Sequence, residues 1–238
     1  MSRVGVVTGL QAEAARLAPA AGAFGESGPL VLCLGPGPRR ARQAARTLVT
    51  RGARWLLSFG LAGGLDPRLV PGTLVVGSIV IDALGRQWPA DAAWGARVER
   101  AGEVLGLVVG PIAGRDRALW SPAEKTACHL RTGALAVDME SHAVAAVAAE
   151  AGIPFLVLRA IADPARRTVP AAARSAIAAD GRTQVASVVA ALAAKPWQTP
   201  NLARLAGDGQ RAFRALGRAA HLRPLLLADL GEGLLDVP

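Results

Sequence analysis

The chain has 238 residues, of which 52% are hydrophobic and 19% charged, and this balance excludes disorder for most of its length. Its net charge of +9 favours an anionic partner, such as a phosphorylated substrate or an anionic lipid surface. Because the arginines are scattered, aromatic residues are few and no nucleic-acid-binding motif is present, we do not expect a nucleic acid as partner.

Short β-branched runs alternate with Ala-rich stretches along most of the chain. In chain order, strands are predicted at residues 3–8, 30–34, 54–59, 73–82, 107–113, 134–138 and 155–161. Helices are predicted at residues 11–21, 39–51, 122–130, 140–151 and 170–194. Several strands are apolar on both faces, as are central strands that helices cover on each side. The pattern predicts a three-layer α/β/α fold with a central mixed sheet, in which ligands bind beyond the carboxyl ends of the strands.

The composition changes after Lys195-Pro196, so we divide the chain into a domain at residues 1–195 and a basic, helical C-terminal extension at residues 196–238. One face of a helix in this extension would carry Leu202, Leu205, Ala212, Phe213, Leu216 and Ala220. The opposite face would carry Arg204, Arg211, Arg214 and Arg218. Two interpretations stay open: a helix packed against the core with a solvated basic face, or an amphipathic helix that touches a membrane surface or a lipid substrate.

The two cysteines, Cys33 and Cys128, are too few for a disulfide framework and lack the spacing of metal ligands. His129 and His142 share no spacing with other donors, so no metal site is predicted. The N-terminus carries no basic-then-apolar leader, and no apolar run approaches the ~20 residues that a membrane-spanning helix needs. We therefore expect a cytoplasmic protein with reduced thiols.

Two glycine-rich segments are candidate binding turns, because backbone N–H groups in such turns can hold anions or ribose oxygens. The first contains Gly35 and Gly37 and precedes a helix that begins with Arg39; these three are candidate anion-binding residues. The second runs Gly60-Leu61-Ala62-Gly63-Gly64, after the strand predicted at 54–59. Neither matches a phosphate-binding Lys loop, and the first is not a dinucleotide fingerprint, which disfavours a dinucleotide-dependent enzyme.

Three carboxylates lie where strands end or helices begin. Glu13 opens the first helix, Glu140 follows Asp138 and Met139 where a strand becomes a helix, and Asp163 follows the strand at 155–161. Any one of them could be an ordinary helix cap or a first-turn acid favoured by the helix dipole. Three at matching ends of three strands are less easily explained in that way, and they indicate a site at this edge of the sheet.

Four segments of the chain resemble, in order, the motif series of the purine nucleoside phosphorylase and methylthioadenosine/adenosylhomocysteine nucleosidase superfamily. These segments are residues 4–13, residues 58–64, Val137-Asp-Met-Glu140 and Leu158-Arg-Ala-Ile-Ala-Asp163. The layout, which includes Asp138-Met-Glu-Ser-His142, is most similar to the hopanoid-associated phosphorylases. Those enzymes are implied to remove adenine from adenosylhopane in bacterial lipid synthesis.

The resemblance implies a role for each candidate residue. Asp163 matches the general acid that shares a proton with N7 of the purine and so stabilises the departing adenine. Glu140 matches the acceptor of hydrogen bonds from the ribose hydroxyls, with Met139 as an apolar wall against the sugar. Glu13 matches the carboxylate that orients and deprotonates the attacking water. Gly60, Leu61, Ala62 and Gly63 complete the substrate-binding set, and no cofactor or metal is implied.

Departures from the family pattern favour water over phosphate as the nucleophile. Where the phosphorolytic branch carries an Arg and a Ser that bind phosphate, this chain has Ser58 and Leu61, and Leu61 has no donor in its side chain. Glu13 would also repel a phosphate at that place. Phosphorolysis stays open, since Arg39 or its neighbours could supply a phosphate site. Ala162 replaces the hydroxyl residue that usually precedes the acid.

The expected reaction is release of adenine from a 5′-substituted adenosine, with adenosylhopane as the best single substrate. Three alternatives stay open: a phosphorolytic purine nucleoside phosphorylase, a general methylthioadenosine/adenosylhomocysteine nucleosidase, and an inactive nucleoside-binding regulator. We expect a small-molecule or lipid-linked nucleoside as ligand, and peripheral membrane contact through the C-terminal extension as a hypothesis. The resemblance further implies a homo-oligomer.

Overall fold

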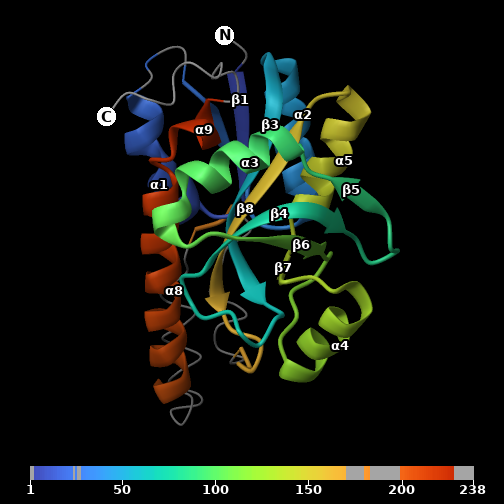
Figure 1. The fold of residues 1–238 in the computed structure, drawn as a ribbon, viewed down its shortest axis with the longest axis vertical. Helices are drawn as coiled ribbons and strands as arrows, with labels where there is room; N and C mark the ends of the chain where they lie inside the picture. Colours follow the sequence, from blue (N-terminus) through green and yellow to red (C-terminus); the bar gives the residue numbers. More distant parts are fainter. Residues whose placement is uncertain (1–2, 24, 26–27, 170–179, 183–198, 228–238) are drawn as a thin grey trace.

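The structure is a computed structural model that describes residues 3–23, 25, 28–169, 180–182 and 199–227 (Figure 1). Its strands are β1 (Arg3–Thr8), β2 (Leu30–Cys33), β3 (Ala53–Gly64), β4 (Leu74–Ile81), β5 (Gln87–Pro89), β6 (Val108–Gly114), β7 (Ala136–Asp138) and β8 (Phe155–Asp163). Its helices are α1 (Gln11–Gly22), α2 (Pro38–Thr50), α3 (Ala92–Ala101), α4 (Pro122–Thr132), α5 (Ser141–Ala151), α8 (Thr199–Ala219) and α9 (Arg223–Leu226), with a 3-10 turn η2 (Glu103–Leu105).

The strands form one eight-stranded mixed sheet in the order β2-β1-β3-β7-β6-β4-β5, with β8 off this path. β8 pairs in parallel with β3 and antiparallel with β4. Because β3 also pairs with β7, β7 with β6 and β6 with β4, these five strands close into a ring. The ring brings the end of β8 next to the ends of β3 and β7, which together carry most of the predicted site.

Helices cover the sheet on both faces, which confirms the predicted three-layer α/β fold (Figure 1). On one face Leu17 of α1, Trp94 of α3 and Leu216 of α8 pack in one core with strand residues such as Leu158. On the other face, α2 and α5 bury Ala-rich surfaces against the same strands. The small Ala side chains on these helices let the layers approach closely, and the residues that form both cores are apolar.

Among the elements that were predicted, β3 differs most in its bounds, because it runs to Gly64 instead of ending at residue 59. The segment interpreted as a glycine-rich turn is therefore strand. It is held from both sides: Gly60 pairs with Arg159 and Gly63 with Asp163 on β8, while Gly63 also pairs with Val137 on β7. Pairing with two neighbours overrides the weak strand propensity of glycine.

Most other element ends fall within a residue or two of the prediction, and β8 likewise extends through Asp163. The elements β5, α3 and η2 were not predicted. Of the helix predicted at residues 170–194, only residues 180–182 are described, and they form a turn in which Gly181 has a φ of +83°. The rest of that prediction, and the boundary drawn at Lys195-Pro196, lie outside the described residues.

The C-terminal helix α8 packs against the core. Ala212, Ala215, Leu216 and Ala219 are buried, in the same core as strand residues of β3 and β8. The arginines predicted on the opposite face, Arg204, Arg211, Arg214 and Arg218, are exposed. This part of the apolar face is therefore packed in the core, as in the first of the two interpretations, whereas Leu205 and Phe213 are partly exposed. The side chain of Leu202 lies outside the described residues, and membrane contact stays a hypothesis. No helix in the described part of the chain is long and apolar enough to span a membrane.

Candidate active site

Glu13 is buried at the start of α1, with 4% of its surface exposed. One carboxylate oxygen accepts hydrogen bonds from the N–H groups of Gly9 and Leu10, each at 2.9 Å, and the other from the N–H of Leu61 at 2.8 Å. The bond to Leu10 is the capping bond expected of an acid in the first turn. A carboxylate that only capped α1 would face solvent. The hydrogen bond from the Leu61 N–H, on β3, holds the side chain of Glu13 inside the molecule.

The glycine at position 60 makes this arrangement possible. A Cβ atom at Gly60 would lie 2.6 Å from Oε1 of Glu13, far inside normal contact distance. Glycine is needed here for close approach of a side chain to the strand, and not for a turn. Leu61, Ala62 and Gly63 continue β3 toward its carboxyl end, with Ala62 buried.

Glu140 lies at the N-terminus of α5 and meets the first glycine segment. Its Oε1 accepts the N–H of Gly37 at 2.8 Å, and its Oε2 accepts the N–H of Met139 at 3.3 Å. The anion held by the Gly35–Gly37 turn is thus the protein's own carboxylate, and the Gly37 N–H is not free for a substrate phosphate. A Cβ at Gly9 would lie 3.1 Å from Glu140, so Glu140 and Glu13 flank the same glycine.

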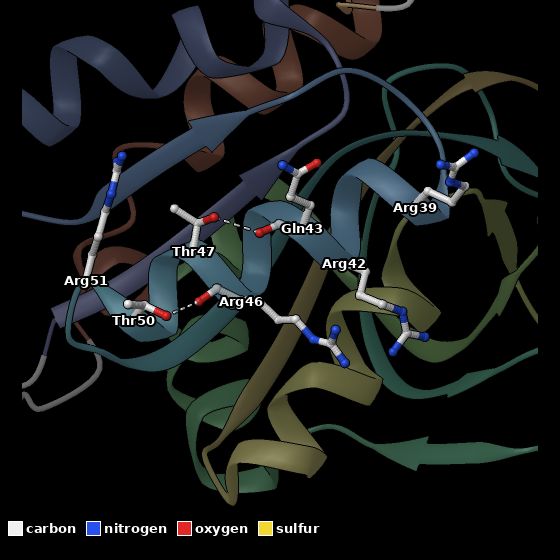
Figure 2. Close-up of a pocket in the computed structure, with 7 residues that line it drawn as sticks. All are labelled: Arg39, Arg42, Gln43, Arg46, Thr47, Thr50 and Arg51. Atoms are coloured by element: carbon white, nitrogen blue, oxygen red, sulfur yellow. Dashed lines mark hydrogen bonds between the residues drawn. The ribbon is translucent and has the colours of Figure 1, made fainter.

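Arg39, the third candidate anion ligand, is exposed near one end of α2. Figure 2 shows it near one end of α2, with Arg42 and Arg46 farther along the helix. These residues line a hollow formed by α2 side chains and Arg51, which follows the helix. Glu13, Glu140 and Asp163 do not line this hollow. Arg42 and Arg46 pair with Glu150 of α5 at 3.2 and 3.0 Å. In the described part of the chain, no hydrogen bond or ion pair joins Arg39 to Glu13, Glu140 or Asp163, and its role as an anion ligand stays a prediction.

A buried arginine, to which the sequence analysis assigned no role, lies near Glu13 and Glu140 and pairs with Asp138. Arg159, on β8, is 1% exposed; its Nε donates to Asp138 at 2.5 Å and its Nη2 to the Ser58 hydroxyl at 2.6 Å. Asp138 also accepts from the N–H and hydroxyl of Ser141. A charged residue within the apolar run 155–161 was the signal available in the sequence.

Burial and charge set the ionisation of the cluster. Burial raises the pKa of Glu13 to about 7, and the negative charge of Glu140 adds to this, against the N–H of Leu61 and the Arg159 guanidinium. Burial and the neighbouring Asp138 raise the pKa of Glu140 above its ordinary value. Burial alone would raise the pKa of Asp138 too, but the Arg159 guanidinium and Ser141 hold it below its ordinary value. A proton is thus exchangeable near neutral pH on Glu13.

Asp163 ends β8, where its carboxylate lies beside the backbone of Gly63, with 16% of the side chain exposed. Burial raises its pKa above the ordinary value, although Lys125 opposes this. Gly60 and Gly63, which contact Glu13 and Asp163, are three residues apart on β3, or about 10 Å at the rise of a strand. The structure thus places Glu13 and Glu140 together near Gly60 of β3, and Asp163 beside Gly63, farther along that strand.

Comparison with known proteins shows the family to which the chain belongs. The sequence profile of the phosphorylase superfamily matches residues 4–194. A search of curated proteins found no match. Among solved structures, the chain is similar to a futalosine hydrolase of Helicobacter pylori, with 18% identity, a TM-score of 0.66, and coverage of 92% of this chain and 97% of that one.

Two further structures share the fold. A 5′-methylthioadenosine/S-adenosylhomocysteine nucleosidase from Neisseria meningitidis, in complex with methylthio-immucillin-A, has 16% identity and a TM-score of 0.68, covering 94% of this chain and 98% of that one. A putative nucleosidase of the same type from Francisella philomiragia has 18% identity and a TM-score of 0.66, covering 93% and 96%. Such coverage extends beyond residue 195, so α8 is part of the shared fold and the C-terminal segment is not wholly an addition to it.

Proposed function

This chain belongs to the phosphorylase superfamily of enzymes, and we propose that it hydrolyses the N-glycosidic bond of a 5′-substituted adenosine and releases adenine. The observation that carries the proposal is Glu13. It is a buried carboxylate fixed by three backbone N–H groups, with a pKa of about 7, beside a second carboxylate, Glu140. This is the arrangement that a general base for water requires near neutral pH.

The reaction follows from the three carboxylates. Glu13 accepts a proton from water as the water oxygen bonds to C1′ of the ribose. The bond from C1′ to N9 breaks, its electron pair stays on the purine, and Asp163 donates a proton to N7. Glu140 accepts hydrogen bonds from the ribose hydroxyls, and its negative charge stabilises the cationic sugar of the transition state. Met139 forms an apolar wall beside the sugar in this proposal.

Two observations favour water over phosphate. The Leu61 N–H already donates to Glu13, so it is not free for a phosphate oxygen. The Gly37 N–H is engaged by Glu140 in the same way. A phosphate dianion entering beside two buried carboxylates would be repelled by both.

We propose adenosylhopane as the substrate, with ribosylhopane as the second product, because the motif layout resembles the hopanoid-associated phosphorylases. Membrane contact would then be made mainly by the exposed arginines of α8, since Ala212 and Leu216 of its apolar face are buried. Replacing Arg204, Arg214 and Arg218 with Gln should weaken binding to anionic liposomes without changing the circular dichroism spectrum. A homo-oligomer, implied by the resemblance, is tested by sedimentation equilibrium.

The alternative substrate class is that of the general methylthioadenosine/adenosylhomocysteine nucleosidases. The shared fold includes α8, so the C-terminal segment no longer argues against this alternative. Leu61 and Ala162 remain the departures that separate this chain from the family pattern.

The test is incubation of the purified full chain with adenosylhopane in detergent, 5′-methylthioadenosine and S-adenosylhomocysteine in separate reactions, each with and without phosphate. We expect adenine and a free ribosyl product, formed equally well in both buffers. A strict requirement for phosphate, with a ribosyl 1-phosphate as product, would establish phosphorolysis instead. No adenine from any of these nucleosides would reject the proposed function, and saturable binding without release would indicate a nucleoside-binding regulator.

A further inference from the structure

Lys125 is a fully buried lysine, in a chain with only one other lysine and many arginines. It lies on α4, whose N-terminus is fixed by Pro122 and a capping box between Ser121 and Glu124. A buried ammonium is costly unless it is paired and hydrogen-bonded. The surroundings of Lys125 therefore explain why it is tolerated.

The ammonium of Lys125 makes a short hydrogen bond to Oδ2 of Asp163. It also donates to three backbone carbonyl oxygens: Pro164 at 3.0 Å, and Asp163 and Arg167 at 3.4 Å each. All four acceptors belong to the end of β8 or the loop that follows it. A compact ammonium on a flexible stem can be surrounded by acceptors in this way.

The hydrogen bond from Lys125 fixes the orientation of the Asp163 carboxylate. Within the described residues, its other carboxylate oxygen, Oδ1, makes no hydrogen bond, and the side chain is 16% exposed. The preceding residue, Ala162, has no polar side-chain atom that could orient the carboxyl. Lys125 is the side chain that does so.

We propose that Lys125 is a positioning residue for Asp163: it turns Oδ1 toward the purine and stabilises the carboxylate that remains after the proton is transferred. This inference rests on the proposed function, in which Asp163 is the acid. As the proton passes from Asp163 to N7, a negative charge forms on a carboxylate already in contact with an ammonium. The interaction strengthens as the transition state is approached, so its loss affects kcat more than KM.

The charged groups around Asp163 come from three elements. Lys125 approaches from α4 and Arg167 from the loop after β8, while Asp208 approaches from α8 and pairs with Arg167 at 2.9 Å. Burial raises the pKa of Asp163, Lys125 and Arg167 lower it, and Asp208 raises it. Removing Lys125 therefore raises this pKa further. Because an acid acts in its protonated form, the alkaline limb of the pH profile of kcat should move to higher pH.

Three variants separate the charge of Lys125 from its clamping of the loop. Lys125→Met removes both, Lys125→Gln keeps amide donors for the carbonyl oxygens without the charge, and Lys125→Arg keeps the charge. We expect both Lys125→Met and Lys125→Gln to lower kcat about 10²-fold, at the lower end of what a general acid contributes. Both should also shift the alkaline limb of the pH profile to higher pH, whereas Lys125→Arg should keep it near its wild-type position. The control is Arg117→Met, which removes an exposed cation that pairs with Glu124 and does not contact Asp163.

The proposal would be overturned if Lys125→Gln kept full activity and the alkaline limb of its pH profile stayed at the wild-type position. Lys125 would then only hold the loop that follows β8 in place. The pKa of Asp163 is also measured without turnover, by titration of its ¹³C-labelled carboxyl in NMR spectra, assigned by the signal lost in Asp163→Asn. We expect a higher pKa in Lys125→Gln than in the wild type; an equal pKa would reject the electrostatic role. If the wild type cleaves no nucleoside, the proposed function fails, whereas this titration still decides whether Lys125 controls Asp163. If Lys125→Met does not fold, the comparison of Lys125→Gln with Lys125→Arg still separates the charge of Lys125 from its contacts with the loop.

Discussion

At the scale of single residues, this site is built from carboxylates that backbone N–H groups and two buried cations hold in place. Glu13 and Glu140 are fixed mainly by main-chain donors from Gly9, Leu10, Leu61 and Gly37. Hydrogen bonds from such donors favour the ionised form and so lower the pKa of a carboxylate. At Glu13 the effect of burial is larger than theirs, and its pKa rises to about 7.

The pH dependence of turnover follows from Glu13. A general base must be ionised, so on the acid side of the profile kcat/KM should rise about tenfold per pH unit below about 7. The alkaline limb is set by Asp163, which must be protonated. Glu13→Gln should lower kcat about 10² to 10⁴-fold, because the amide cannot accept the proton from water. The control is Glu150→Gln, an exposed carboxylate paired with Arg42 and Arg46, which should leave the profile unchanged. A flat profile from pH 5 to 8 would contradict the assignment of Glu13 as base.

Arg159 is the residue whose loss should cost the most stability. Asp138 is buried with it, and Arg159→Met would leave that carboxylate without its cation. Breaking a buried pair in this way costs about 3–5 kcal/mol of unfolding free energy. The double variant with Asp138→Asn should recover part of this loss, because no unpaired charge remains. Urea denaturation measures both, with Arg42→Met, from an exposed pair, as a control that should cost at most about 1 kcal/mol.

At the scale of elements, β3 connects the parts of the site. Its carboxyl half contacts Glu13 through Gly60 and Asp163 through Gly63, and it pairs with both β7 and β8. The strand is therefore a rigid spacer between the sugar end and the purine end of the proposed substrate. Rigid elements hold catalytic groups more reliably than loops do.

Gly60→Ala tests this contact. Its Cβ would lie 2.6 Å from Oε1 of Glu13, and three N–H bonds oppose any shift of that carboxylate. We expect kcat to fall by at least about 10²-fold, as for loss of a positioned base, while circular dichroism shows a folded protein. Gly207→Ala on α8, where a Cβ meets no atom within 4 Å, should leave kcat unchanged and add up to about 1 kcal/mol of stability. Wild-type turnover in Gly60→Ala would show that the contact is not needed.

The sequence predicted β1 at its observed bounds and most other elements to within a residue or two, because their apolar runs are long and bounded by clear stops. It failed at the end of β3, where pairing with two strands outweighs the turn preference of glycine. The carboxylates were visible as acids at element ends. Lys125 was not, since its burial depends on the loop after β8 folding over α4, and nothing local in the sequence encodes that contact.

At the scale of the whole molecule, the C-terminal segment completes the core that supports the site. α8 packs against β8, the strand that carries Arg159 and Asp163, and Asp208 of α8 pairs with Arg167 in the loop that Lys125 clamps. The division at residue 195 separates the sequence by composition, but the described residues on either side share one hydrophobic core. Stability and catalysis should therefore depend on both parts together.

Truncation after residue 195 tests this dependence. It would remove three fully buried leucines, Leu216, Leu225 and Leu226, each worth about 1.5–3 kcal/mol of burial. Their sum is comparable to the unfolding free energy of a typical domain, which is about 5–15 kcal/mol. We expect the truncated chain to lose cooperative thermal unfolding, whereas the triple variant Arg204→Gln, Arg214→Gln, Arg218→Gln, which changes only exposed side chains, should keep the wild-type Tm within a few degrees. A truncated chain that unfolds cooperatively and still releases adenine would show that residues 1–195 are a domain on their own.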